Sequence, residues 1–331
     1  MVSGLNPFAA FGSVASGSRF VGRKAESEML TSIVSRGVGS RALIGEPKIG
    51  KTSLAMVVYN EARNLDCQAI VVDVSTCGPE ESIFDLLAGE LGVPRDLTNV
   101  DRNSSYDSVR RWLLDAVQNG DRHVIIIDEF DSVAETRDPT ISIRRLREII
   151  SNPGRFGTVA LIVSRRKLGA IEQQIANLST LEGVCPSIYL RPFDISETLE
   201  MAGRGWSDEP INEIARFAQD FSGGHPYLSE MVMYARFDGT EASRVEEVLG
   251  PEVTSYFDKL VDLLADDNVL EVVLRLARGE AVGRGMQSES LIQYGVCLLD
   301  GAGFLHLWTP TFADYLRRSA LDETPTWTTD K

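Results

Sequence analysis

Short apolar runs alternate with helical periods over the first part of the chain. Four runs are apolar at nearly every position and rich in β-branched residues, at positions 42–44, 69–74, 124–127 and 158–163. Such runs are typical of strands that are buried on both faces of a parallel sheet. Amphipathic helical periods lie between them, at positions 51–64, 82–91, 106–118 and 141–150. The alternation predicts a doubly wound α/β domain over residues 19–192, with a fifth short strand at 187–190.

After Pro192 the strand pattern ends and helical periods follow. Helices predicted at 197–204, 209–220 and 226–235 would form an all-helical lid over residues 193–241. Residues 242–321 contain helical runs at 254–264, 268–277 and 288–294, then two short strands around a Gly-rich turn, and a last helix at 310–319. Helices followed by a β-hairpin and a helix predict a winged-helix domain. We expect residues 1–18 to form a loosely held N-terminal arm and residues 322–331 a polar tail.

Composition narrows the class of protein. The chain has 331 residues, of which 43% are hydrophobic, so it can form about two domains with cores of their own. There are 33 basic and 48 acidic residues, a net charge of −15. This balance disfavours non-specific binding to nucleic acid or anionic lipid, although it leaves room for a local basic site. The 4 cysteines form no CxxC pair and the 3 histidines are scattered, which disfavours a zinc site or a disulfide framework.

The apolar runs and the N-terminus bear on membrane insertion and secretion. No apolar run approaches the roughly 20 residues of a membrane-spanning helix, so we expect a soluble protein. The N-terminus has no basic residue before Arg19 and no continuous apolar core, unlike a secretory signal. The expected location is therefore the cytoplasm.

The most specific motif follows the first predicted strand. Residues 45–52 read GEPKIGKT, which matches G-x-x-x-x-G-K-[ST] at every position. Glycines let backbone N–H groups approach phosphates, and the start of the next helix adds partial positive charge. Lys51 is placed to reach the β- and γ-phosphates, and the Thr52 hydroxyl to bind Mg²⁺. The predicted nucleotide-binding positions are Gly45, Glu46, Pro47, Lys48, Ile49, Gly50, Lys51, Thr52 and Ser53; a chance Gly-rich turn is the weaker alternative.

A second motif ends the third predicted strand. Residues 124–127 are apolar and Asp128 and Glu129 follow directly. Asp128 is the candidate for holding Mg²⁺, and Glu129 the candidate for orienting or deprotonating the attacking water. A strand that simply ends in solvated acids is the other interpretation.

A third motif ends the fourth predicted strand, where Ser164, Arg165 and Arg166 follow an apolar run. Ligands of open α/β sheets bind at the carboxyl ends of the strands. One of these arginines is therefore a candidate for contacting the γ-phosphate. The alternative is a solvated basic strand end.

Together these residues resemble the STAND branch of the AAA+ P-loop ATPases, close to archaeal-type ATPases with a C-terminal winged helix. The family opens its nucleotide domain with an apolar-apolar-Gly-Arg box, and residues 20–23 read Phe-Val-Gly-Arg here, followed by Lys24 where an acid is usual. The resemblance implies that Phe20 and Val21 pack against the adenine and ribose, and it adds Arg23 to the nucleotide-binding set. It covers about residues 19–320.

Two further matches support this resemblance. The family's fourth strand ends in a hydroxyl residue and an arginine, matched by Ser164 and Arg165, so the resemblance favours Arg165 over Arg166. The family's Gly-x-Pro lid motif is matched at residues 224–226, which makes Pro226 a candidate for packing near the base. His225 within this motif could sense phosphate charge, but it is more often a capping or core residue.

Other charged features have structural alternatives. Arg144, Arg145 and Arg147 could supply an arginine finger to a neighbouring subunit, but more often such residues form a solvated helix face. The predicted recognition helix and wing of the winged helix contain no Lys or Arg, so DNA binding through them lacks its electrostatic component. We interpret this domain as an interdomain clamp or a protein-docking module.

Two functions from different classes follow. The first is a slowly hydrolysing switch ATPase that binds ATP or ADP with Mg²⁺ between the α/β domain and the lid, and gates assembly or a separate sensor or effector protein. Family habit suggests a role in bacterial defence or signalling. A nucleotide-dependent homo-oligomer is one form that the assembly could take, and we expect no membrane partner. The alternative is a DNA-associated AAA+ loader or transposition-type regulator, and an inactive scaffold is a weaker third. The motifs do not separate ATP from GTP strictly, but no Asn-Lys-x-Asp guanine motif is present, which favours ATP.

Overall fold

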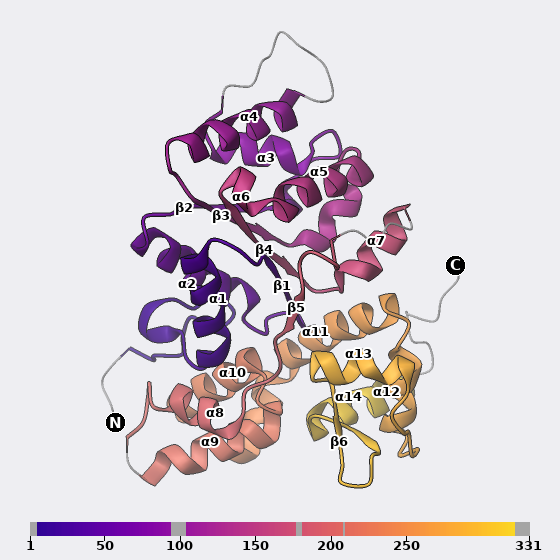
Figure 1. Ribbon diagram of the computed structural model, residues 1–331. Coiled ribbons are helices and arrows are strands. Elements are labelled where there is room, and N and C mark those ends of the chain that lie inside the picture. The colour runs from indigo at the N-terminus through magenta and orange to yellow at the C-terminus, as the bar shows by residue number, and fades with distance from the viewer. Residues whose placement is uncertain (1–4, 94–103, 177–180, 208, 322–331) are drawn as a thin grey trace. The chain divides into compact units, whose positions relative to one another are not determined.

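A computed structural model describes residues 5–93, 104–176, 181–207 and 209–321 (Figure 1). The chain forms two compact units. The first, which we call the α/β unit, comprises residues 23–44 and 51–188. The second, the helical unit, comprises residues 1–22, 45–50 and 189–331. The loop 45–50 thus belongs to the helical unit, although it connects two elements of the α/β unit.

A five-stranded parallel sheet forms the core of the α/β unit, in the order β2-β3-β4-β1-β5. Its strands are β1 (Arg41–Ile44), β2 (Gln68–Asp73), β3 (His123–Asp128), β4 (Thr158–Ser164) and β5 (Ser187–Tyr189). The central strands β3 and β4 are buried along their whole length, as their unbroken apolar runs predict. In the register, Asp73 lies opposite Asp128 and Ile44 opposite Ser164. The carboxyl ends of four strands therefore meet at one edge of the sheet.

Helices cover both faces of this sheet because the chain reverses its direction across it. The step from β1 to β2 crosses the sheet one way, whereas the steps from β2 to β3, β4 and β5 go the other way. Right-handed crossovers then place α2 on one face and the later helices on the other, as Figure 1 shows. The helices are α1 (Lys24–Arg36), α2 (Lys51–Asn64), α3 (Ile83–Glu90), α4 (Ser104–Gln118), α5 (Pro139–Ser151), α6 (Pro153–Phe156) and α7 (Leu168–Ala176).

Helices dominate the helical unit. They are α8 (Ile195–Ala202), α9 (Glu209–Ser222), α10 (Pro226–Phe237), α11 (Val245–Asp266), α12 (Leu270–Ala277), α13 (Met286–Tyr294) and α14 (Pro310–Leu321). Between α13 and α14, β6 (Cys297–Leu299) and β7 (Leu305–Leu307) pair antiparallel, so the predicted hairpin is present. An aromatic cluster forms part of the core, with the Phe257 ring 4.9 Å from the Phe312 ring and 6.3 Å from the Trp308 ring.

The expectation of a loosely held N-terminal arm is wrong for residues 5–18. Phe8 is fully buried in the helical unit, and its ring stacks on Trp206 at 5.3 Å. Asn6 Nδ2 donates to the Tyr234 carbonyl at 3.0 Å, and Arg204 donates to the Pro7 carbonyl. The Gly- and Ser-rich composition concealed this docking, because one buried aromatic residue has no periodic pattern to reveal it.

Two helices also differ from the prediction. Helix α11 begins at Val245, earlier than the predicted position 254, and it runs through Pro251, a residue type that disfavours helix interiors. Helix α1 was not predicted. Its N-cap is Arg23 in a left-handed conformation, without the Ser, Thr, Asp or Asn that usually signals a helix start.

In the part of the chain that the structure describes, no helix combines the length and the apolar character that crossing a bilayer requires.

Candidate functional site

The strand–loop–helix context of the G-x-x-x-x-G-K-T motif is present. Loop 45–50 leaves β1 and enters α2, which begins at Lys51. Lys48 and Gly50 both adopt positive φ, +61° and +99°. At Gly50 this conformation requires glycine, because an L side chain rarely adopts it. The loop thus turns the chain sharply at the N-terminus of a 14-residue helix, where backbone N–H groups favour anions.

The residues of the loop differ in burial. Glu46 and Ile49 are fully buried, Pro47 is half-buried and Lys48 is exposed. A side chain at Gly45 would place its Cβ 2.9 Å from Ile49 Cγ2 and 3.0 Å from the Leu190 carbonyl oxygen. Glycine is therefore needed at position 45 for close packing, not for an unusual φ.

Lys51 is buried and lies among acids of the α/β unit. Its side chain has little contact with water, and burial lowers its pKa to about 8 although Glu129, Asp131 and Asp128 oppose the shift. A further negative charge beside Lys51, such as a phosphate, would raise its pKa again, because an opposite charge favours the protonated amine. Ser53, the next predicted phosphate-side residue, is also buried.

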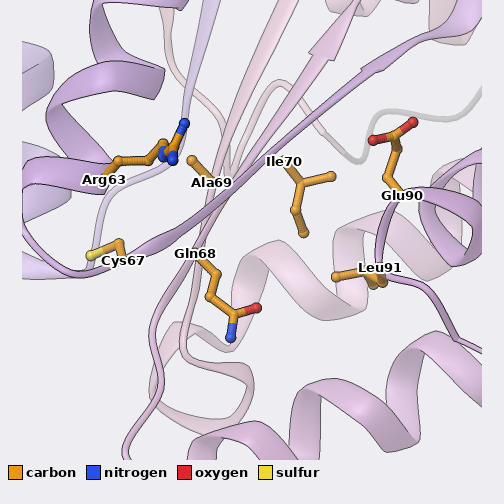
Figure 2. A pocket seen from close by; sticks show the side chains of 7 residues that line it. All are labelled: Arg63, Cys67, Gln68, Ala69, Ile70, Glu90 and Leu91. Carbon is orange, nitrogen blue, oxygen red and sulfur yellow. The ribbon is translucent and has the colours of Figure 1, made fainter.

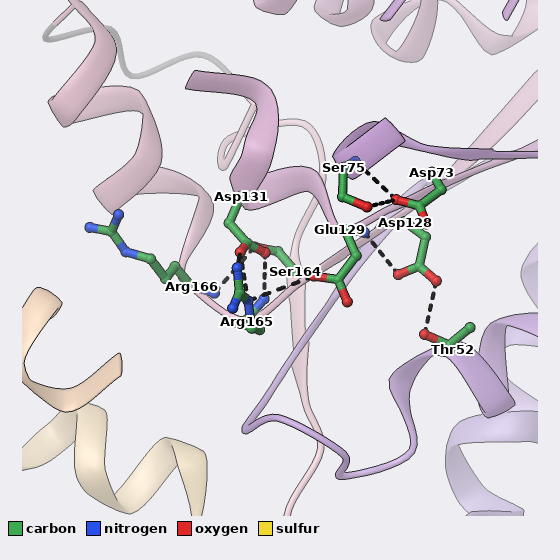
Figure 3. A network of polar contacts seen from close by, with 9 residues as sticks. All are labelled: Thr52, Asp73, Ser75, Asp128, Glu129, Asp131, Ser164, Arg165 and Arg166. Atoms are coloured by element: carbon green, nitrogen blue, oxygen red, sulfur yellow. Dashed lines mark hydrogen bonds and ion pairs between the residues drawn. The ribbon is translucent and has the colours of Figure 1, made fainter. Parts of the chain in front are cut away.

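Thr52 and Asp128 lie in direct contact, as Figure 3 shows. Thr52 Oγ1 donates to Asp128 Oδ2 at 2.8 Å, across 76 positions of sequence. Burial raises the pKa of Asp128, and the charge of Asp73 on the neighbouring strand adds to the effect. A hydroxyl beside a carboxylate is an oxygen donor set that suits Mg²⁺. The two residues therefore fit the metal role that the sequence predicted for them.

Glu129 follows β3 with a left-handed backbone, φ 47° and ψ 44°. Such a conformation costs a non-glycine residue on the order of 1–3 kcal/mol and is often found at functional sites. The chain turns away from the direction of β3 at Glu129. The Glu129 backbone N–H donates to Asp128 Oδ1 at 2.9 Å. Burial and the nearby Asp131 raise the pKa of Glu129, which makes it a better proton acceptor.

Arg165 directly follows β4 and contacts two acids that follow β3 in the chain, Glu129 and Asp131 (Figure 3). Its Nε donates to Asp131 Oδ2 at 2.6 Å and lies 3.7 Å from Glu129 Oε2. Although burial opposes it, the hydrogen bonds from Arg165 hold the pKa of Asp131 below its ordinary value. Arg166 differs, because its Nη1 donates to Gln174 Oε1 at 2.8 Å on α7. The two arginines therefore contact different parts of the unit: Arg165 the acids that follow β3, and Arg166 helix α7.

Asp131 is a site residue that the sequence analysis missed. It lies two positions after Glu129, in the sequence Asp-Glu-Phe-Asp, and its carboxylate also accepts a 3.3 Å hydrogen bond from Ser164 Oγ. A third acid so close to an acidic pair was the available signal.

The residues predicted for the base side are divided between the units. In the helical unit, Phe20 is half-buried, Val21 is buried and Pro226 is the half-buried first residue of α10. Arg23 belongs to the α/β unit, where it is buried and its Nη1 lies 3.8 Å from Glu26 Oε1. Their predicted contact with a base stays a prediction.

The arginine cluster on α5 and His225, which the sequence offered as further candidates, lie in different surroundings. The Arg145 guanidinium lies over the Tyr106 ring, 4.5 Å from its centre, whereas Arg144 and Arg147 are exposed. His225 is fully buried at the N-cap of α10.

A pocket of about 380 Å³ lies elsewhere in the α/β unit (Figure 2). Its lining comprises Arg63, Cys67, Gln68, Ala69, Ile70, Glu90 and Leu91. Gln68 begins β2 and pairs with His123, whereas Asp73 at the other end of β2 pairs with Asp128. The pocket is thus at the opposite end of the strands from the candidate site.

Known proteins resemble this chain in part of the sequence and in fold. Residues 35–166 match the family model of the AAA domain. No curated protein sequence matches the chain.

Solved structures match it over almost its whole length. The Walker-type ATPase PABY2304 of Pyrococcus abyssi has a TM-score of 0.64 and 12% identity, over 94% of this chain and 99% of that chain. The ORC2 protein of Aeropyrum pernix, in ADPNP–ADP complexes, has a TM-score of 0.57 and 15% identity, over 95% and 96%. CDC6P of Pyrobaculum aerophilum has a TM-score of 0.51 and 12% identity, over 94% and 96%. At these identities the likeness shows the fold: a AAA-like P-loop domain followed by a helical C-terminal region.

Proposed function

We propose that this protein binds ATP with Mg²⁺, hydrolyses it slowly, and uses the nucleotide state to gate its own assembly or its contact with a separate sensor or effector protein. We place it in the STAND group of AAA+ ATPases, in the cytoplasm, with defence or signalling as its setting. The observation that carries the proposal is the 2.8 Å contact between Thr52 and Asp128, with buried Lys51 and the partly exposed Glu129 nearby.

Each residue has a role in this proposal. Lys51 pairs with the β- and γ-phosphates, and Thr52 and Asp128 hold the metal ion. Mg²⁺, when bound, neutralises phosphate charge and orients the transferred group. Glu129 orients the attacking water and accepts its proton.

The contacts of Arg165 support slow hydrolysis. Its guanidinium is engaged by Asp131 and lies 3.7 Å from Glu129 Oε2. For Arg165 to turn toward a γ-phosphate, and for Glu129 to act as a base without a nearby cation, these contacts must rearrange. Such a step adds a conformational barrier to the chemistry.

Calorimetric titration with ATP and ADP, with and without Mg²⁺, tests the proposal together with a phosphate-release assay. The parent protein should bind both nucleotides and release phosphate slowly. Lys51→Ala should lose binding by about 10- to 150-fold, because it removes a charge-assisted contact to phosphate. Lys259→Ala, at an exposed position of α11, is the control and should bind like the parent. Unchanged ATP affinity in Lys51→Ala would refute the assignment.

The output of the switch is proposed to lie in the C-terminal part of the helical unit. The order α12, α13, β6–β7 hairpin and α14 supports a winged helix, and Leu298 and Phe304 on the hairpin are about half exposed, 47% and 46%. These side chains suit protein docking. Light scattering with and without a non-hydrolysable ATP analogue tests assembly, and Leu298→Ser with Phe304→Ser tests the hairpin. Equal mass in both nucleotide states would refute gated assembly.

A DNA-associated AAA+ loader is the second candidate. The fold also resembles the ORC1 protein of Aeropyrum pernix, solved in complex with DNA, with a TM-score of 0.52 and 14% identity over 91% of this chain. Against it stand the net charge of −15 and the absence of Lys and Arg from α13 and the hairpin. Binding to a labelled DNA duplex at several salt concentrations distinguishes the two functions. A loader should bind the duplex with an affinity that falls steeply with salt, whereas a protein-gated switch should not bind it.

A further inference from the structure

A fully buried carboxylate lies inside the candidate phosphate-binding loop. Glu46 is the second residue of the loop and has no solvent exposure. A carboxylate taken out of water is unfavourable unless polar groups of the protein compensate it. The groups that face Glu46 therefore show what holds the loop in place.

Tyr256 supplies a hydrogen bond to this carboxylate. Its hydroxyl donates to Glu46 Oε2 at 2.7 Å, across 210 positions of sequence. Tyr256 lies on α11 and is itself buried, 3% exposed. Burial, with the charge of Glu46, raises the pKa of Tyr256 well above its ordinary value, so the phenol keeps its proton and is the donor.

His225 faces the same oxygen from a third element. Its Nε2 lies 3.9 Å from Glu46 Oε2, and its ring centre lies 4.7 Å from that of Tyr256. His225 is the N-cap residue of α10. One carboxylate oxygen thus faces α10 and α11, and all three residues belong to the helical unit.

The loop is held in this unit at a second point. Lys48 Nζ donates to the Gly12 carbonyl at 3.0 Å, in the N-terminal segment. Glu46 and Lys48 lie on either side of Pro47, whose ring fixes one backbone angle. The contacts at Glu46 and Lys48 therefore bracket the part of the loop whose backbone must be shaped for a phosphate.

We propose that Tyr256 is a positioning residue for nucleotide binding, which acts through Glu46 to hold the phosphate-binding loop in its binding conformation. In this role Tyr256 acts through Glu46 and not by direct contact with the nucleotide. Because Tyr256 lies on α11, its hydrogen bond to Glu46 links the loop to that helix. This inference rests on the proposed function, since it concerns the same nucleotide site.

A double-mutant cycle on ATP and ADP affinity tests the inference in the full chain. Tyr256→Phe removes the hydroxyl, and Glu46→Met removes the carboxylate that accepts from it. Each single change should weaken both nucleotides by about 10-fold, within the range of a lost charge-assisted hydrogen bond. The double variant should be no weaker than either single variant, because both changes break the same contact. Glu46→Gln keeps an acceptor for the Tyr256 hydroxyl and should lose less affinity than Glu46→Met.

Tyr294→Phe is the matched control for a merely structural effect. Tyr294 is a buried tyrosine of the same unit whose hydroxyl donates to Asp267 Oδ2 at 2.8 Å. Loss of the Tyr294 hydroxyl should lower the melting temperature and leave nucleotide affinity unchanged. If Tyr256→Phe fails to fold, the contrast between Glu46→Met and Glu46→Gln still decides, since only the first lacks an acceptor.

The failure of this inference differs from the failure of the proposed function. A parent protein that binds neither nucleotide overturns the proposed function. A parent that binds, with Tyr256→Phe binding equally well or with additive effects in the cycle, overturns only the role of Tyr256.

Discussion

Arg165 and Asp131 form a contact in which one partner is buried and the other is half exposed. The Arg165 backbone N–H donates to Asp131 Oδ1 at 3.1 Å, and its Nε donates to Oδ2 at 2.6 Å. The Asp131 side chain is 5% exposed and that of Arg165 is 46% exposed. The carboxylate is therefore the fixed member, and the guanidinium is the member that can reach a new anion.

Arg165→Ala should weaken ATP binding by about 10-fold and leave ADP binding nearly unchanged. A charge-assisted hydrogen bond contributes about 1.5–3 kcal/mol, and we expect the lower end because the γ-phosphate must compete with Asp131. Titration of both nucleotides measures the difference. Arg166→Ala, which removes the contact with Gln174 on α7, is the control. Equal losses for ATP and ADP, or a larger selective loss in Arg166→Ala, would reject this role for Arg165.

Glu129→Gln should retain ATP binding and slow hydrolysis by at least about 100-fold, since general-base catalysis contributes on the order of 10²–10⁴. The amide has the shape of the carboxylate but does not accept the proton of the water. Single-turnover phosphate release measures this, with binding measured separately. Glu135→Gln, at an exposed position, should match the parent. Hydrolysis at the parent rate in Glu129→Gln would show that another group is the base.

Asp128→Asn should abolish the dependence of ATP affinity on Mg²⁺. The amide keeps an acceptor for Thr52 but removes the negative charge that favours a divalent cation. Titration of ATP at increasing Mg²⁺ concentration, in parent and variant, measures the effect. A variant that responds to Mg²⁺ as the parent does would exclude Asp128 from the metal site.

The affinity for ATP should fall as the pH rises above about 8. Burial lowers the pKa of Lys51 to about 8, so the unliganded protein loses this proton as the pH rises through that value. Below it Lys51 is charged and binds phosphate without taking up a proton; above it, binding must also protonate the amine. Calorimetry between pH 7 and about 9.5 should show both weaker binding and proton uptake. Lys51→Arg should lack this decrease, because its guanidinium stays protonated over the whole range. If the affinity of Lys51→Arg also fell with rising pH, a group other than Lys51 would be responsible.

Phe8→Ala should destabilise the helical unit by about 3–5 kcal/mol, the usual cost of removing a buried phenylalanine. Phe8 is fully buried and stacks on Trp206, which gives the N-terminal segment its place. Thermal unfolding measures the loss. Leu5→Ala is the control, because Leu5 is 99% exposed and should change nothing. A parent-like melting temperature in Phe8→Ala would mean that the segment is not docked.

Local sequence determined the elements that carry the phosphate and metal chemistry. The strands before Gly45, Asp128 and Ser164 were predicted within one or two residues, and α2 was predicted with its observed bounds. These elements can be predicted from sequence because fully buried strands need continuous apolar runs and because the loop requires its glycines. The pairing of Thr52 with Asp128 followed from a general rule, since parallel strands bring their carboxyl ends to one edge.

Only the tertiary structure decided which other groups meet these residues. Asp131 holds Arg165 because a short turn after β3 faces the end of β4, and Tyr256 meets Glu46 because α11 packs against a loop 210 positions earlier. The spacing of the acids could mark Asp131 as a site residue, but no sequence pattern showed that it contacts Arg165 or that Tyr256 contacts Glu46. Phe8 was missed for the same reason. Local composition reports what a segment prefers on its own, whereas burial of a single side chain depends on which distant surface is available to cover it.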